Sequence, residues 1–173
     1  DRRQRQMCIR DSYHGAHDYA QISTTPKAPP NFPIGKSDTA GMPRAVSDLT
    51  FVAPYNDPET LNAILKKHAN EIAAVIIEPI QRIIRPRDHF LQKVRELCSL
   101  YDVPMILDEV VTGFRYGLGG AQEYFDVTPD LATYGKIIGG GLPVGLIAGR
   151  ADIMDQANPC LLYTSDAADD RVS

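Results

Sequence analysis

The sequence predicts an α/β domain with a mostly parallel sheet and flanking helices. A continuous run of β-branched and aliphatic residues, 72–77, and a second apolar run, 103–107, are each followed by an acid, Glu78 and Asp108. Such runs are typical of strands that are buried on both faces of a sheet. Between them, residues 90–101 carry apolar side chains at helical spacing. Strands that alternate with helices favour a parallel α/β arrangement.

The other expected elements follow the same logic. A helix should begin at Asp57, because Asp57 can cap it and Pro58 suits a first turn. Residues 24–51 are rich in proline, which predicts a surface excursion without long regular structure. Further strands are expected at 131–134 and 144–148, and further helices at 119–125 and from residue 150 to residue 154.

Both ends of the chain are expected to be foreign to the protein. Residues 1–12 read DRRQRQMCIRDS and show no apolar period, and residues 160–170 read CLLYTSDAADD. A DNA sequence that encodes the first segment has a reverse complement that encodes the second in a shifted frame. This inverted element resembles the transposon-end adaptors of sequencing libraries. We therefore expect residues 1–12 and 160–173 to pack on nothing, and residues 13–159 to form the native segment.

Composition narrows the classes of partner and compartment. A net charge of −4 at pH 7 favours neither nucleic acid nor an anionic membrane, and no apolar run is long enough to span a bilayer. Outside the two ends the only cysteine is Cys98, so we expect no disulfide framework and a reducing compartment such as the cytoplasm. Cys98 lies on an apolar helical stripe, and we interpret it as a core residue rather than a nucleophile.

Lys136 stands in the stretch DLATYGKIIGGGLP, between a short apolar run and three glycines. Apolar surroundings free a lysine amine as a nucleophile, and glycines let the backbone approach a ligand closely. The alternative is a solvated lysine beside a turn. Asp108 favours a reactive lysine, because Asp108 ends a predicted strand and ligands of α/β sheets bind beyond the carboxyl ends of strands. A carboxylate that keeps a pyridine nitrogen protonated and a lysine that condenses with an aldehyde are what pyridoxal 5′-phosphate requires.

Other interpretations of these motifs fit less well. The lysine of GKII is not followed by Ser or Thr, so the stretch is not a Walker loop, and the three glycines do not match a dinucleotide fingerprint. His14 and His17 have the spacing of two metal ligands on a helix. No third ligand with suitable spacing accompanies them, so we expect no metal.

Residues 78–154 resemble the large domain of class III, fold type I, pyridoxal-phosphate-dependent aminotransferases. The motifs EPIQ, LDEVVTGFR, GGAQEYFDVTPDLATYGKIIGGGLPVG and AGRADIM occur in that family's order. The likeness is closest to the glutamate-1-semialdehyde aminomutase-like branch and makes residues 13–159 a partial cofactor-binding large domain. It implies an enzyme that moves an amino group on a small amino acid or amino aldehyde, and a homodimer as its assembly.

The resemblance also implies roles for five residues. Lys136 matches the lysine that forms the internal aldimine and moves protons at the substrate carbon. Asp108 matches the acid that pairs with the pyridine nitrogen. Val110 and Tyr13 match the side chains that pack on the two faces of the ring, although core packing is the alternative for Tyr13. His14 is the neighbour of that aromatic residue in the YHG motif.

Two positions depart from related patterns. Val111 stands where several members carry a glutamine. Ile83 stands where ornithine and 4-aminobutyrate types carry a glutamate and where the aminomutase carries an asparagine. These departures leave a general aminomutase-like aminotransferase. A phosphate-binding Ser-Gly-Thr segment should precede Tyr13 and a small domain should follow Pro159, so we expect an internal fragment. The alternative is a catalytically incompetent fragment or a non-enzymatic interaction module.

Overall fold

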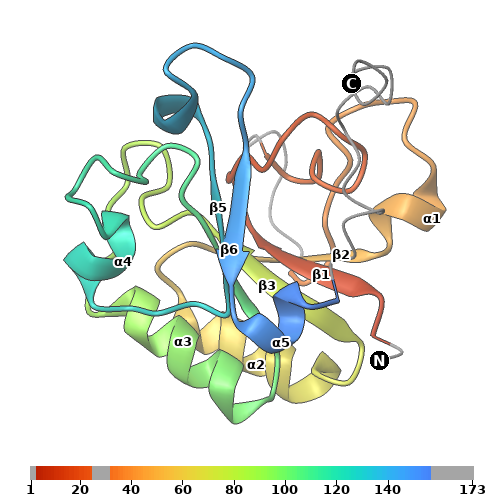
Figure 1. Cartoon of the computed structure of the whole chain (residues 1–173). Helices are drawn as coiled ribbons and strands as arrows, with labels where there is room; N and C mark the ends of the chain where they lie inside the picture. Colours follow the sequence, from red (N-terminus) through yellow and green to blue (C-terminus); the bar gives the residue numbers. More distant parts are fainter. Residues whose placement is uncertain (1–2, 25–31, 157–173) are drawn as a thin grey trace.

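Six strands form one sheet in the order β2-β1-β3-β4-β5-β6. The computed structural model describes residues 3–24 and 32–156. The strands are β1 (Arg5–Ile9), β2 (Thr50–Ala53), β3 (Ile72–Ile77), β4 (Met105–Asp108), β5 (Leu131–Tyr134) and β6 (Leu146–Gly149). Every neighbouring pair is parallel except β5 and β6, which are antiparallel. The predicted mostly parallel α/β arrangement is therefore confirmed (Figure 1).

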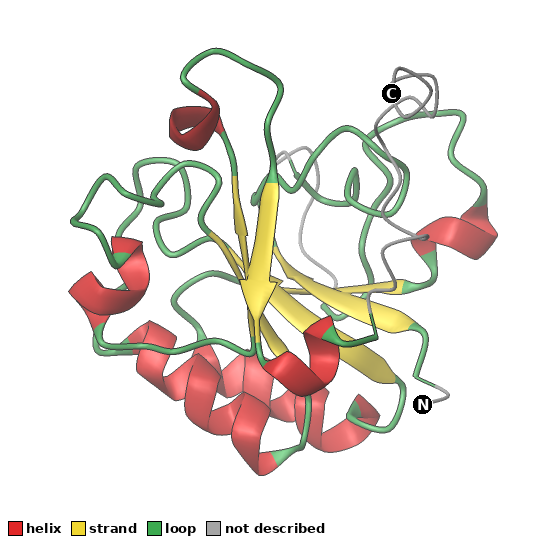
Figure 2. Cartoon of the chain, viewed as in Figure 1, coloured by secondary structure: helices red, strands yellow, loops and turns green. Residues whose placement is uncertain are grey.

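Short helices connect these strands. They are α1 (Arg44–Ser47), α2 (Pro58–His68), α3 (Phe90–Leu100), α4 (Gly120–Phe125), the 3-10 helix η1 (Lys136–Gly139) and α5 (Ala151–Met154). As the sequence indicates, the Asp57 side chain caps α2 and accepts a hydrogen bond from the Thr60 backbone N–H at 2.9 Å. α2 and α3 lie together on one face of the sheet (Figure 2). Of the helices in residues 3–24 and 32–156, none is long and apolar enough to cross a bilayer.

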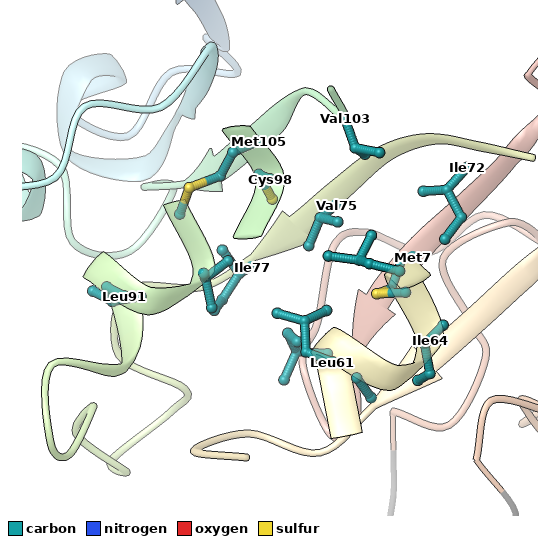
Figure 3. Close-up of a cluster of buried hydrophobic side chains, with 14 of the residues drawn as sticks. Met7, Leu61, Ile64, Ile72, Val75, Ile77, Leu91, Cys98, Val103 and Met105 are labelled. Carbon is teal, nitrogen blue, oxygen red and sulfur yellow. The ribbon is translucent and has the colours of Figure 1, made fainter. Parts of the chain in front are cut away.

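The main core lies between this pair of helices and the sheet. Leu61 of α2 and Leu91 of α3 are fully buried, and they belong to one apolar cluster with Met7 and Val75 of the strands (Figure 3). Cys98 of α3 is buried in the same cluster, and burial raises the pKa of its thiol to about 12. A thiol that stays protonated is a poor nucleophile. The prediction of a core cysteine is therefore confirmed.

The opposite face of the sheet is covered less completely. Residues 24–51, predicted as a surface excursion, contribute to a second small core in which Met42 packs with Ile22 and Val52. Farther along the sheet, Ile76 of β3 and Ile106 of β4 are only half-buried. The expectation of burial on both faces of β3 and β4 is therefore met on the helical face alone.

Strand β1 corrects the prediction for the first segment. Residues 1–12 were expected to pack on nothing, yet β1 pairs with both β2 and β3, and Met7 and Ile9 are buried. Met7, Cys8 and Ile9 form a short apolar strand that pairs with a parallel neighbour on each side. So short a strand has no periodicity from which it could be predicted. Whether adaptor DNA encodes this segment remains a prediction that the nucleotide sequence tests. Residues 1–2 and 157–173 lie outside the described residues.

Candidate functional site

The two residues of the predicted catalytic pair lie at one edge of the sheet. Asp108 is the last residue of β4, and its partner in the parallel neighbour β5 is Thr133. β5 ends at Tyr134, and Lys136 opens η1 directly beyond it (Figure 1). The expected placement of Asp108 and Lys136 near strand ends is confirmed, and the expected convergence of their side chains remains a prediction. Their catalytic roles remain predictions.

Asp108 is a buried carboxylate with donors on both oxygens. Its side chain is 9% exposed. Nδ1 of His14 lies 2.6 Å from Oδ2, while the Val110 N–H and the Thr133 hydroxyl donate to Oδ1 at 3.1 and 3.3 Å. These three partners fix the orientation of the Asp108 carboxyl group at the carboxyl end of β4.

His14 is more than a neighbour of Tyr13, because it contacts Asp108 from a segment far away in the chain. Its other ring nitrogen, Nε2, is buried and has no hydrogen-bond partner in the part of the chain that the structure describes. Buried polar atoms are nearly always paired in native proteins, so an orphaned one calls for an explanation. An atom of this kind beside a buried carboxylate indicates a place where a polar group binds.

Glu78 joins this group of residues from the end of β3. It is buried and accepts a hydrogen bond from the backbone N–H of Tyr13 at 3.2 Å. Burial raises the pKa of Glu78, and the nearby charge of Asp108 adds to the effect, whereas the Tyr13 amide and His14 oppose it. The Tyr13 side chain is itself 53% exposed, so the alternative that Tyr13 packs in the core is wrong.

Lys136 follows Gly135, which is buried and extended. It is exposed and adopts a φ of 48°, which is the left-handed region. That conformation costs a non-glycine residue roughly 1–2 kcal/mol and persists only where the surroundings enforce it. Val110 packs against the preceding Gly135, where an added Cβ would lie 3.3 Å from Cγ1 of Val110. The residue predicted to cover one ring face therefore lies beside the backbone that carries the lysine.

Three residues of the site were missed by the sequence analysis. Glu109 is 1% exposed and accepts a hydrogen bond from Nε2 of Gln122 at 3.0 Å. The same Nε2 donates to the hydroxyl of Tyr134 at 2.6 Å. The motifs LDEVVTGFR, GGAQ and TYGK contain all three, so the signal was present. The sequence motifs did not predict that these three side chains contact one another.

The two departures from related patterns lie on the surface. Val111 is 45% exposed and Ile83 is 93% exposed. His17, the second histidine of the predicted spacing, is also exposed. Within the described ranges, no group of three or more potential ligand side chains is placed to hold a metal ion.

Known proteins resemble the chain in both sequence and structure. Two relatives carry the name glutamate-1-semialdehyde 2,1-aminomutase. The one from Alkaliphilus oremlandii is 49% identical over 150 residues, which cover 85% of this chain and 35% of the relative. The one from Methanosarcina acetivorans is 44% identical over 154 residues, which cover 87% and 36%. The chain thus spans about a third of the length of the curated relatives it matches.

Solved structures show the same fold. An omega-transaminase from Sphaerobacter thermophilus superimposes with a TM-score of 0.85 at 39% identity, over 91% of this chain and 37% of that one. A structure described as a transaminase with PLP bound gives a TM-score of 0.80 at 31% identity, over 91% and 37%. The family described as Aminotransferase class-III matches residues 1–163. The large-domain fold, the paired site residues at its sheet edge and this match together show that the chain belongs to the class III, pyridoxal-phosphate-dependent aminotransferases.

Proposed function

We propose that this chain is the central part of an aminomutase-like enzyme that moves an amino group with the help of pyridoxal 5′-phosphate. The longer protein that carries these residues is called the full-length parent below. The observation that carries the proposal is the pair formed by buried Asp108, with His14 at its Oδ2, and Lys136 at the end of the neighbouring strand. Amino-group transfer needs both a fixed negative charge and a reactive amine in one place.

The residues present fit the ring of this cofactor. The buried carboxylate of Asp108 and the orphaned Nε2 of His14 can provide polar contacts to the ring. Half-buried Val110 and exposed Tyr13 can provide apolar surfaces. When bound, pyridoxal phosphate supplies an aldehyde for a lysine amine and a ring that withdraws electrons from the substrate carbon.

Each residue then has a defined task. Asp108 would hold a proton at the ring nitrogen, because a buried carboxylate favours a positive charge beside it. His14 orients that carboxylate through its hydrogen bond to Oδ2. Lys136 would bind the cofactor and move a proton at the substrate carbon, a task that suits an amine on a flexible stem. Val110 and Tyr13 would pack on the ring and exclude water from it.

The substrate class follows from the relatives and from two surface positions. The relatives named above support a small amino aldehyde or amino acid as substrate. Val111 and Ile83 lack the polar side chains of ornithine-type enzymes. We therefore favour an aminomutase-like reaction on one small molecule. Transfer between two different molecules is the finer alternative, and assays with single and paired substrates distinguish them.

We also propose a homodimer in the cytoplasm for the full-length parent. Exposed apolar side chains near the site, such as Phe114 and Leu118, support association between copies. Analytical ultracentrifugation tests this, and a fully active monomer would contradict it. The two described cysteines, Cys8 and Cys98, are buried free thiols, in keeping with a reducing compartment, and cell fractionation tests the location.

Borohydride trapping followed by peptide mapping tests the function. The full-length parent is incubated with pyridoxal phosphate, reduced and digested, and we expect the reduced cofactor on the peptide that contains Lys136. Cofactor found on Lys66, Lys67 or Lys93 would overturn the proposed mechanism. An absorbance scan of the 173-residue chain with the cofactor distinguishes a binding-competent segment from an incompetent fragment or an interaction module.

A further inference from the structure

The backbone that carries Lys136 must be held in place by its surroundings. Lys136 has a φ of 48° although it is not a glycine. Left-handed residues of this kind persist at functional sites only where neighbouring groups enforce them. Lys136 itself is exposed, whereas the preceding Gly135 is buried, so the residues just before Lys136 can constrain its backbone.

Tyr134, the last residue of β5, is fixed on several sides. Its hydroxyl accepts a hydrogen bond from Nε2 of Gln122 at 2.6 Å. Its ring lies 5.7 Å from the ring of Phe114, measured between centroids. The ring also presses on Gly113, where an added Cβ would stand 2.7 Å from Cδ1 of Tyr134. The end of β5 therefore has little freedom to rotate.

Gln122 is in turn oriented by a buried carboxylate. Oε1 of Glu109 accepts from the Gln122 backbone N–H at 3.2 Å and from its Nε2 at 3.0 Å. Oε2 accepts from the Ala121 N–H at 2.7 Å and from the Thr112 hydroxyl at 3.1 Å. With both oxygens satisfied, the Glu109 side chain is a rigid anchor. Because Nε2 of Gln122 donates to both Glu109 and Tyr134, Gln122 links the Glu109 carboxylate to the end of β5.

Glu109 also ties this chain of hydrogen bonds to the acid of the site. It directly follows Asp108, and its backbone N–H donates to the carbonyl oxygen of Thr133 at 2.9 Å. Thr133 in turn donates its hydroxyl to Asp108. The segments that carry the carboxylate and the lysine are thus joined both through the sheet and through side chains.

We propose that Glu109, Gln122 and Tyr134 are positioning residues that hold Lys136 in its left-handed conformation and so aim its amine at the cofactor. The proposal rests on the proposed function of Lys136. Each of the three acts through the backbone of residues 134–136 rather than by touching substrate or cofactor. Loss of any link should slow the reaction of the Lys136 amine with the cofactor aldehyde while leaving cofactor binding through other contacts in place.

The test uses the full-length parent with Gln122→Leu, Tyr134→Phe and the double variant. The rate at which added pyridoxal phosphate becomes trapped on Lys136 by borohydride is measured by peptide mapping. We expect each single variant to lower that rate on the order of tenfold. Because the two residues form one link, the double variant should be no slower than Gln122→Leu alone. Tyr101→Phe is the matched control, since Tyr101 donates to the side-chain amide of Asn62 at 2.8 Å away from the site.

A second readout needs no cofactor. Burial raises the pKa of Tyr134, the charge of Glu109 adds to this, and the hydrogen bond from Gln122 opposes it. Gln122→Leu should therefore raise the pKa of Tyr134 further, as measured by NMR of ring-labelled tyrosine, while the thermal midpoint changes as little as in the control.

The outcomes separate the two proposals. If the unmodified parent traps no cofactor on Lys136, the proposed function fails. If the parent does so and both single variants trap cofactor at the parent's rate, the positioning role fails while the function stands. Additive losses in the double variant, or equal slowing in Tyr101→Phe, would also overturn the positioning role, because they indicate general loosening of the fold.

Discussion

Asp108 and Asp130 are two buried carboxylates at opposite edges of the same pair of strands. Asp108 ends β4, whereas Asp130 directly precedes β5 and binds Met105 at the start of β4. The side chain of each is 9% exposed. The two carboxylates are therefore equally buried, and they differ in the groups that bind them.

Asp130 has two cationic partners. Its Oδ2 lies 2.5 Å from Arg95 and its Oδ1 lies 2.9 Å from Arg150, and the Met105 N–H donates at 2.7 Å. Burial alone would raise the pKa of Asp130, but the Met105 amide and the two guanidinium groups outweigh it and hold the pKa below its ordinary value of 3.8. The charge is compensated within the fold.

In the part of the chain that the structure describes, Asp108 is bonded to two neutral donors and to His14. A buried carboxylate without a permanent cation attracts one from outside, such as a protonated ring nitrogen. The same residue type at the same depth thus binds two arginines at one edge, and we propose that it serves cofactor binding at the other.

Lys136→Ala should produce the largest effect at the functional edge. No other amine is held at the cofactor aldehyde, so covalent trapping in the full-length parent should fall to background. Cofactor affinity is the poorer readout, because ring and phosphate contacts remain. Lys93→Ala, an exposed lysine of α3, is the control and should trap normally.

Asp108→Asn should slow the reaction and spare the fold. The amide keeps the shape but removes the carboxylate that we propose keeps the ring nitrogen protonated, and a charge-assisted hydrogen bond contributes roughly 1.5–3 kcal/mol. We expect turnover to fall at least on the order of tenfold to a hundredfold. Unchanged turnover would contradict the role of Asp108. The exposed Asp48→Asn serves as control.

Asp130→Asn should lower stability and leave the reaction unchanged. Arg95 loses its carboxylate partner, whereas Arg150 keeps Asp152, so the free energy of unfolding should fall by about 1–3 kcal/mol, while turnover per folded molecule stays the same. Because the folded pKa of Asp130 is lowered, its stabilisation is present above 3.8 and is lost as the pH falls through the folded value. Urea unfolding at several pH values checks both points. If Asp130→Asn lowered turnover without lowering stability, the proposed difference between Asp108 and Asp130 would be wrong.

Glu78→Gln should give the smallest effect. The pKa of Glu78 is raised above its ordinary 4.5, first by burial, so this carboxyl contributes stability below 4.5 that is lost as the pH rises through the folded value. Glutamine keeps an oxygen for the Tyr13 N–H and avoids that loss. The variant should therefore be slightly more stable than the unmodified protein at neutral pH and equal to it in acid, by thermal unfolding of the cofactor-free parent.

Local patterns were enough for much of the fold and for the catalytic pair. The capped start of α2, the stripe of α3 and the apolar runs of β3 and β4 depend on neighbours within a few residues, so sequence spacing predicts them. Lys136 and Asp108 were placed at strand ends for the same reason. Strands β1 and β2 were missed, because a short strand is stabilised by its neighbours in the sheet rather than by its own pattern.

The sequence by itself thus determined the α/β class and the family, and it predicted the roles of Lys136 and Asp108. Only the tertiary structure decided which groups surround them. His14 contacts Asp108 across 94 residues, and Gln122 bridges Glu109 and Tyr134 from a separate helix. Helical and strand periods report contacts over a few positions, whereas these contacts arise when parallel strands bring distant segments to one edge. The different partners of Asp108 and Asp130 have the same origin. Each acid lies at a strand end, and only folding brings two arginines to Asp130 and a histidine to Asp108.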